Sequence, residues 1–323
     1  MKRAITAAAL LAAAVPAMAN DSVAETAAGG LVLKRSDAID MVSEDLFVSA
    51  AEVRVAYVFR NRTAKPVTTI VAFPLPDRDL AAEFGSDVSF PSGFRTRVEG
   101  KPVAMTVEHK ALLEGADRTA ELQRLGVPLS GEGIRAALDR LPAATQARLV
   151  KSGLAIPDEY DSGKGWEKHL APAWSVRETW YWTQTFPAGR DLKVEHAYAP
   201  GTGASVDSAL SIPELRRSAE GARMIARYCV DAAFLAGIER IKRSSPYAPE
   251  QRIGYVLTTG ANWRAPIGRF RLMVDKGSAD NLVSFCGEGV RKVSPTRFEM
   301  IRTNWRPARD LDVVIVSPRL PGG

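Results

Sequence analysis

Residues 52–77 have the sequence EVRVAYVFRNRTAKPVTTIVAFPLPD, and this stretch indicates how the chain folds. Apolar and polar side chains alternate through its first half, which is the period of a half-buried β-strand. The side chains on the apolar side are Val53, Val55, Tyr57 and Phe59. A polar break at 61–66 leads into a second, β-branched run that ends at Phe73-Pro74-Leu75-Pro76. We therefore predict a long antiparallel hairpin at the centre of a β-sandwich.

Strand-like alternation recurs on both sides of this stretch. Ser43-Glu44-Asp45 is typical of a turn between two short strands, and Glu99-Gly100-Lys101-Pro102 of the turn in a second hairpin. Residues 174–186 and 192–198 alternate around a Pro/Gly turn, which predicts a third hairpin. Other expected strands are 31–34, 39–41, 46–48, 95–98, 103–107, 253–258, 267–274, 282–285, 296–301 and 312–316. The predicted fold class is mainly β (α+β), with antiparallel β-sandwich modules and a helical insertion.

The insertion is indicated where Ala, Leu and Arg become common and β-branched residues become rare. Short helices are predicted at 116–125, 132–141 and 143–150, followed by a polar loop at 158–168. Two later helices are predicted at 213–227 and 231–242. The expected organisation is a leader at 1–19, an N-terminal β-sandwich part at 20–110, the helical insertion at 111–172, a hairpin completing the first sandwich at 173–212, and a C-terminal helix-plus-sheet domain at 213–323. The pattern does not decide whether the chain has one sandwich core or two.

The first residues have the features of a secretory signal peptide. A basic tip (Lys2 and Arg3) precedes an apolar run and then Ala17-Met18-Ala19, an A-x-A cleavage signal. The apolar run is shorter than the roughly 20 residues that span a bilayer, and no later run is long and apolar enough. We expect cleavage after Ala19, a periplasmic protein, and no transmembrane segment once the leader is removed.

Two cysteines, Cys229 and Cys286, would then lie in an oxidising compartment. Neither belongs to a C-x-x-C motif or has a histidine close by in the sequence, so redox or nucleophilic chemistry has no support. We predict that the two residues form a disulfide bond.

Most cofactor chemistries lack a sequence signal. The three histidines, His109, His169 and His196, are not spaced as metal ligands, so we expect no metal site. Nucleotide-binding glycine motifs and the G-x-S-x-G elbow are absent from the sequence, and we expect neither a cofactor nor catalytic residues. The formal net charge is +6 without a dense Lys/Arg tract, which does not favour nucleic acid as a partner.

Two groups of residues remain as candidate sites. Trp180 and Trp182 share one face of a predicted strand and could form a stacking platform for a sugar or an apolar envelope molecule, although core packing also explains them. His196, Glu195 and Asp191 could supply the acid and base of an envelope hydrolase assembled from distant positions.

Several segments resemble a known family. They are Asn20-Asp-Ser-Val-Ala-Glu25, Gly30-Leu-Val-Leu33, Ser43-Glu-Asp-Leu-Phe47, Val71-Ala-Phe-Pro-Leu-Pro76, Tyr255-Val-Leu-Thr-Thr-Gly-Ala-Asn-Trp263 and Asn281-Leu-Val-Ser-Phe-Cys-Gly-Glu-Gly289. Together they resemble the bacterial exported family known as domain of unknown function 4424, which implies location and architecture but no activity or site residue. A strand, an Asn-containing turn and a strand ending in Phe-Pro-Leu-Pro also resemble vault/inter-alpha-trypsin domains, which favours a β-sandwich.

These observations favour binding or scaffolding in the cell envelope over catalysis. The partner would be an envelope protein or a glycan. The helical block at 111–153 is either a docking region, because the sandwich does not require it, or a lid that covers a sheet edge. Two alternatives stay open: the envelope hydrolase, and a carbohydrate- or lipid-binding module that uses the tryptophans.

Overall fold

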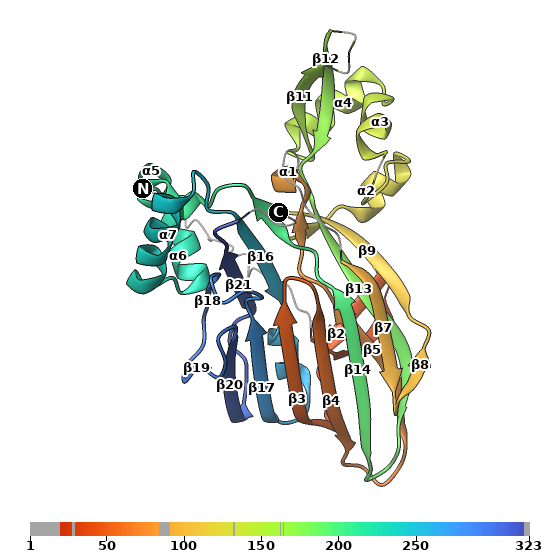
Figure 1. The fold of residues 1–323 in the computed structure, drawn as a ribbon. Helices are drawn as coiled ribbons and strands as arrows, with labels where there is room; N and C mark the ends of the chain where they lie inside the picture. Colours follow the sequence, from red (N-terminus) through yellow and green to blue (C-terminus); the bar gives the residue numbers. More distant parts are fainter. Residues whose placement is uncertain are drawn as a thin grey trace, which may run out of the picture.

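Two layers of β-strands enclose the central core of the molecule (Figure 1). This computed structural model describes residues 20–27, 30–83, 91–131, 133–161, 163 and 165–319. The predicted leader, residues 1–19, lies outside the described residues. Strands dominate over helices, which confirms the predicted mainly β architecture of the α+β type.

One layer is a long sheet, sheet 1. In spatial order its strands are β19 (Arg291–Lys292), β20 (Arg297–Trp305), β17 (Ile267–Asp275), β3 (Ile39–Ser49), β4 (Val53–Asn61), β14 (Asp191–Ala199), β7 (Ser92–Val98) and β8 (Lys101–Val103). Strands β3 and β17 run parallel, whereas the other neighbours in this order are antiparallel. Strands from the beginning and the end of the chain therefore share one sheet.

Two shorter sheets form the opposite layer. Sheet 2 contains β10 (Ala116–Asp117), β9 (Thr106–Leu113), β13 (Ser175–Phe186), β5 (Val67–Pro74), β1 (Ser22–Ala27) and β2 (Gly30–Lys34), with β6 (Arg78–Asp79) also paired to β13. Sheet 3 contains β15 (Gly203–Ser205), β16 (Glu250–Tyr255), β21 (Leu311–Val316) and β18 (Leu282–Phe285). Buried apolar side chains from all three sheets belong to one cluster, so the sandwich is built around a shared core.

The predicted hairpin at 52–77 consists of two real strands, but they do not pair with each other. Strand β4 pairs with β3 and β14 in sheet 1, whereas β5 pairs with β1 and β13 in sheet 2. Residues 62–66 therefore form an arch between the layers, and the hairpin prediction is wrong. Asn61 holds this arch: its Nδ2 donates to the carbonyls of Lys65 (2.9 Å) and Phe186 (3.0 Å).

The prediction of a third hairpin is also wrong, because its two strands lie in different sheets. Strand β13 lies in sheet 2 and β14 in sheet 1, so the turn at 187–190 also crosses between layers. The second hairpin is real but shorter than predicted, since β7 pairs with β8 through a tight turn at Glu99 and Gly100, whose φ angles are 50° and 75°. Positive φ at both turn residues matches the right-handed twist of the strands that it joins. Of the predicted strand 103–107, Val103 belongs to β8, whereas residues 106 and 107 begin β9 in sheet 2.

Ser43-Glu44-Asp45 is not a turn. These residues lie inside β3, which continues from Ile39 to Ser49 with a register shift between Met41 and Ser43. Charged side chains in the middle of a strand are rare in cores, which is why the sequence favoured a turn. Because side chains alternate along the strand, Glu44 faces the core while Asp45 faces outward.

The insertion projects from one end of the sandwich (Figure 1). Its elements are α2 (Thr119–Arg124), α3 (Ile134–Asp139), α4 (Ala143–Lys151), β11 (Ala155–Asp161) and β12 (Trp166–Pro172), and α1 (Leu80–Glu83) lies at its base. The expected loop at 158–168 is mostly a hairpin, because β11 pairs with β12 over their full length. Leu122, Leu138, Leu149 and Trp174 are buried in a cluster separate from the sandwich core.

The C-terminal helices lie beside sheet 3. They are η1 (Ala209–Ser211), α5 (Pro213–Arg216), α6 (Ala219–Tyr228) and α7 (Ala232–Ser244), whereas the short helix η2 (Thr258–Asn262) contacts β1. Phe234, Ile238 and Ile241 on α7 join Val314 and Val316 of β21 in a third apolar cluster. The predicted disulfide is confirmed: Cys229 at the end of α6 is bonded to Cys286, which follows β18, with 5.0 Å between their Cα atoms.

The segment at 213–323 is divided between two clusters. Its helices and part of sheet 3 form the third cluster, whereas β17 and β20 complete sheet 1 and enter the central core. None of the helices in the described residues has the length and apolarity needed to span a membrane.

Candidate functional site

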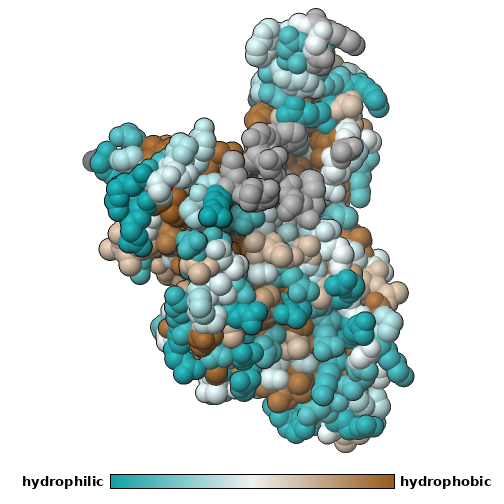
Figure 2. All heavy atoms as spheres, viewed as in Figure 1, coloured by the Kyte–Doolittle hydropathy of each residue, from teal (hydrophilic) through white to brown (hydrophobic). Residues whose placement is uncertain are grey.

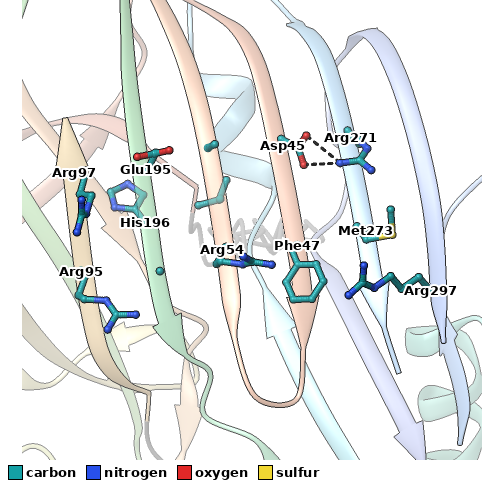
Figure 3. A pocket seen from close by; sticks show the side chains of 13 residues that line it. Asp45, Phe47, Arg54, Arg95, Arg97, Glu195, His196, Arg271, Met273 and Arg297 are labelled. Carbon is teal, nitrogen blue, oxygen red and sulfur yellow. Dashed lines mark hydrogen bonds and ion pairs between the residues drawn. The ribbon is translucent and has the colours of Figure 1, made fainter. Parts of the chain in front are cut away.

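An open depression of about 550 Å³ lies on the outer face of sheet 1 (Figure 3). Its side chains come from β3, β4, β7, β14, β17 and β20, so it runs across the strands. The lining residues are Asp45, Phe47, Arg54, Val55, Ala56, Arg95, Arg97, Glu195, His196, Ala197, Arg271, Met273 and Arg297, of which His196 has a side chain that is 0% exposed. The lower part of the molecule in Figure 2, where these strands lie, shows mostly hydrophilic residues with isolated apolar ones.

Strand alternation places five arginines on this face. In β4, Arg54 points outward between the buried Val53 and Val55, and in β7 Arg95 and Arg97 flank the buried Thr96. Arg271 comes from β17 and Arg297 from β20. Asp45 and Glu195 are the acidic side chains that line the depression, so it is rich in positive charge.

Two of these arginines are held by carboxylates. Arg271 Nε donates to Glu299 at 2.9 Å, and its Nη1 contacts Asp45 at 3.2 Å. The hydrogen bond from Arg271 lowers the pKa of the Glu299 carboxyl, so this carboxylate stays ionised. Arg297 Nε donates to Asp275 at 2.8 Å. These pairs fix one end of the depression.

The other end carries arginines with little or no neutralisation. In the described part of the chain, Arg95 and Arg97 form no ion pair, although Arg97 Nη1 reaches the Gly100 carbonyl at 3.5 Å. Arg54 pairs with Glu52 at 3.2 Å, and its guanidinium lies 4.6 Å from the ring centre of Phe47. Cation–π contact holds such a guanidinium in place while leaving its N–H groups available.

The inner face of the same sheet carries a buried polar cluster. His196 Nδ1 is 2.8 Å from Thr96 Oγ1, and its Nε2 is 3.2 Å from both carboxylate oxygens of Asp21. The side chains of His196 and Asp21 are both 0% exposed. Burial raises the pKa of Asp21, and the neighbouring His196 opposes that shift.

A second part of this cluster surrounds Glu44. Asn20 Nδ2 donates to Glu44 Oε2 at 3.0 Å, and the Tyr255 hydroxyl is 3.5 Å from Glu44 Oε1. The Tyr57 hydroxyl lies 2.9 Å from that of Tyr255 and 2.5 Å from Asn20 Oδ1. Burial raises the pKa of Glu44 to about 8. We define Asn20, Asp21, Glu44, Tyr57, Thr96, His196 and Tyr255 as the buried cluster.

The hydrolase candidates are not brought together. His196 faces the core, whereas Glu195 and Asp191 face outward on the same strand, and Asp191 accepts from Arg60 at 2.5 Å. The Thr96–His196–Asp21 arrangement has the order of a nucleophile, a base and an orienting acid. All three side chains are buried, so a substrate has no access to them in this structure.

The two predicted platform tryptophans belong to the sandwich interior. Trp182 is 5% exposed within the central core and is not open to a ligand. Trp180 is half-buried, stacks on Phe94 with 4.9 Å between ring centres, and donates from Nε1 to Glu178 at 2.6 Å. These strands therefore do not present a two-ring platform to solvent.

Among the described residues, no group of three or more His, Cys, Asp or Glu side chains could hold a metal ion. Neither the arginine-rich depression nor the buried cluster has a local sequence signal that unites its members, because the depression is drawn from six strands and the buried cluster from five strands and residues 20–21. One signal was present: Arg54, Arg95 and Arg97 alternate with apolar or small residues in strands.

Of the comparisons with known proteins, the match to a family model agrees with the resemblance in the sequence. Among curated proteins, none matches this chain. A solved structure from Legionella pneumophila subsp. pneumophila strain Philadelphia 1, a candidate nutrient binding protein, is 17% identical with a TM-score of 0.42, and the match covers 87% of this chain and 68% of the other. The model of the family described as domain of unknown function (DUF4424) matches residues 19–314, and the chain belongs to that family.

Proposed function

We propose that this protein is an exported binding protein of the cell envelope, with an extended polyanion as its ligand. The leader with its Ala17-Met18-Ala19 signal supports export to the periplasm. The observation that carries the proposal is the pair Arg95 and Arg97, exposed in the depression without a carboxylate partner among the described residues.

The width of the arginine-rich face favours a long ligand over a small one. Strands β7 and β20 are five steps apart in sheet 1, which corresponds to about 24 Å at the usual strand spacing. Arg54 lies between these ends. A chain of phosphates, sulfates or carboxylates could contact successive arginines, whereas a single phosphate would reach one end.

The character of the arginines also supports anion binding. A guanidinium offers several N–H donors in a planar fork that matches the oxygens of phosphate and carboxylate groups. Phe47 adds a flat apolar surface beside Arg54, with Arg297 6.0 Å from the ring centre. The side chains in the depression thus offer N–H hydrogen-bond donors and the ring of Phe47, which suits binding of an anionic ligand.

The test uses the double variant Arg95→Gln/Arg97→Gln and titrates it with sodium polyphosphate by calorimetry. We expect affinity to fall about tenfold or more, since hydrogen bonds to charged groups contribute strongly. The matched control is Arg240→Gln/Arg243→Gln, which removes the same charge from the exposed face of α7. Equal loss in both variants, or no binding by the wild-type protein, would refute the proposal.

Ligand length gives a second readout. Polyphosphate should bind the wild-type protein at least about tenfold more tightly than pyrophosphate, because it can contact arginines at both ends of the face. Neutral dextran should not bind. Equal affinity for polyphosphate and pyrophosphate would contradict an extended ligand.

A further inference from the structure

The first residues after the predicted cleavage site lie inside the protein. Asn20, Asp21 and Ser22 are each 0% exposed. Chain ends are ordinarily found at the surface, where they are solvated and poorly ordered. A mature chain beginning at Asn20 would instead place its first residue between the sheets, in the buried cluster.

The surroundings of this segment fit it closely. Trp263 Nε1 donates to the Asp21 carbonyl at 2.8 Å, and Asn262 Nδ2 donates to Ser22 Oγ at 3.0 Å. A Cβ added to Gly260 would lie 2.8 Å from Asn20 Nδ2, so a larger residue at this position would displace Asn20. The protein therefore holds the start of its mature chain with residues from the opposite end of the sequence.

The buried cluster contains two carboxyl groups and one side chain able to carry positive charge. His196 contacts Asp21 and not Glu44. In the described residues, no Lys, Arg or His forms an ion pair with Glu44, whose contacts are the neutral donors Asn20 and Tyr255. An ionised carboxylate buried without a cation strongly destabilises a fold.

We propose that cleavage after Ala19 supplies the missing cation, and that the new α-ammonium of Asn20 pairs with Glu44 inside the sandwich. A leader peptidase would add water across the Ala19–Asn20 bond, giving a free amine on Asn20 and a carboxyl on Ala19 that releases its proton to solvent as the leader leaves. The amine of Asn20 then takes the proton of the Glu44 carboxyl. The result is a buried ammonium–carboxylate pair that the uncleaved chain cannot form.

The acidities of the two groups support this transfer. An α-amino group ordinarily has a pKa of about 7.7–8.0. Burial raises the pKa of Glu44 to about 8 while the residue has only neutral donors around it. Burial of the amine lowers its pKa, and the mutual attraction of the two ions opposes that shift and stabilises the proton on the amine. Cleavage would thus stabilise the folded sandwich, independently of any ligand on its outer face.

The first test measures the start of the exported chain. Intact mass spectrometry of the protein secreted into the periplasm should give a chain beginning at Asn20. A different first residue would overturn the proposal.

The second test is a thermodynamic cycle on the full mature chain. One arm begins at Asn20 and the other carries an added Gly before it, each with Glu44 and with Glu44→Gln. The added residue should raise the unfolding equilibrium constant on the order of a hundredfold with Glu44, and much less with Glu44→Gln. If the extended Glu44 chain does not fold, the extended Glu44→Gln chain should still fold. Equal effects of the extension in both backgrounds would show steric crowding instead and refute the pairing.

Chemical labelling separates the pair from a general loss of stability. The α-amine of the native protein should resist acylation at neutral pH, and Glu44→Gln should make it reactive. The matched control is Glu52→Gln, a partly exposed carboxylate at the end of the same β3–β4 hairpin, which should leave the amine protected. A native α-amine that reacts as fast as the lysines would contradict the proposal.

Discussion

The two faces of sheet 1 differ in the burial of their titratable groups: carboxyl groups are enclosed at the inner face, and arginines are exposed on the outer face. On the inner face, Asp21 and Glu44 are fully buried with His196 as the nearest titratable base. On the outer face, Arg95 and Arg97 are exposed and unpaired among the described residues. Burial makes an unpaired charge costly, so the inner groups govern stability. An exposed unpaired charge costs little free energy because water solvates it, so the outer arginines remain available to a ligand.

Two adjacent residues of β14 show this contrast between the inner and outer faces. Glu195 and His196 follow each other in sequence, yet one lies in the arginine-rich depression and the other among aromatic rings in the core. The pleat of the strand is the cause, because successive side chains point to opposite faces. Changes at neighbouring positions should therefore have very different consequences.

The largest expected effect is that of His196→Ala. It removes the partner of Asp21 and Thr96 and leaves a cavity beside Phe73 and Trp182, so the free energy of unfolding should fall by about 3–5 kcal/mol. The comparison is Glu195→Ala, which should change it by less than about 0.5 kcal/mol. Urea denaturation of both variants measures this difference, and similar losses would break the comparison of the two faces.

The pH dependence of stability should come from the inner face. In a chain extended before Asn20, the pKa of Glu44 is about 8 in the folded state, above the ordinary value of 4.5. The folded state then binds the proton more tightly, so the free energy of unfolding falls as pH rises from about 4.5 to about 8, by about 4 kcal/mol. Burial raises the pKa of Asp21 as well, which has the same sign.

Glu44→Gln should flatten this dependence in the extended chain, because the titrating group is gone. Urea titrations at several pH values measure the slope. If Glu44→Gln leaves the change of unfolding free energy with pH unaltered, another group causes that change. Burial of Glu44 would then not explain why the inner face governs stability.

The smallest expected effect is on the outer face. Asp45→Asn removes one carboxylate from Arg271, which keeps its hydrogen bond to Glu299. Stability should change by less than about 0.5 kcal/mol, while affinity for polyphosphate rises about twofold as the face becomes more positive. Asp191→Asn, in an ion pair with Arg60 outside the depression, is the matched control and should not change affinity. Weaker binding by Asp45→Asn would contradict an anionic ligand.

The strands could be predicted from the sequence, but not their partners. The alternation at 53–59 and 67–71 is local, and both strands are present. Whether residues 62–66 fold back as a hairpin or cross between layers depends on Asn61, which donates to Phe186 more than a hundred residues away. Such a contact has no local signature, so the arch was missed.

The candidate site was missed for a related reason. Glu44 stood out only as a charged residue that interrupts an apolar run, which favours a turn when the chain is read locally. Its hydrogen-bond partners Asn20 and Tyr255 come from two other segments of the chain. The tryptophans drew attention as a possible surface, but the alternation that places them on one face also directs them into the core.

The parallel pairing of β3 with β17 has a consequence for how the protein folds. Arg271 and Asp45, which meet in this pairing, are 226 residues apart in the chain. Contacts over such a separation give a topology that folds slowly, since a long loop must close before the contacts form. A nascent chain that is still being synthesised lacks the strand that completes sheet 1, so the core closes only after most of the polypeptide has left the ribosome. A leader-bearing chain built in this way would have time to reach a translocation machinery before it acquires a rigid tertiary structure.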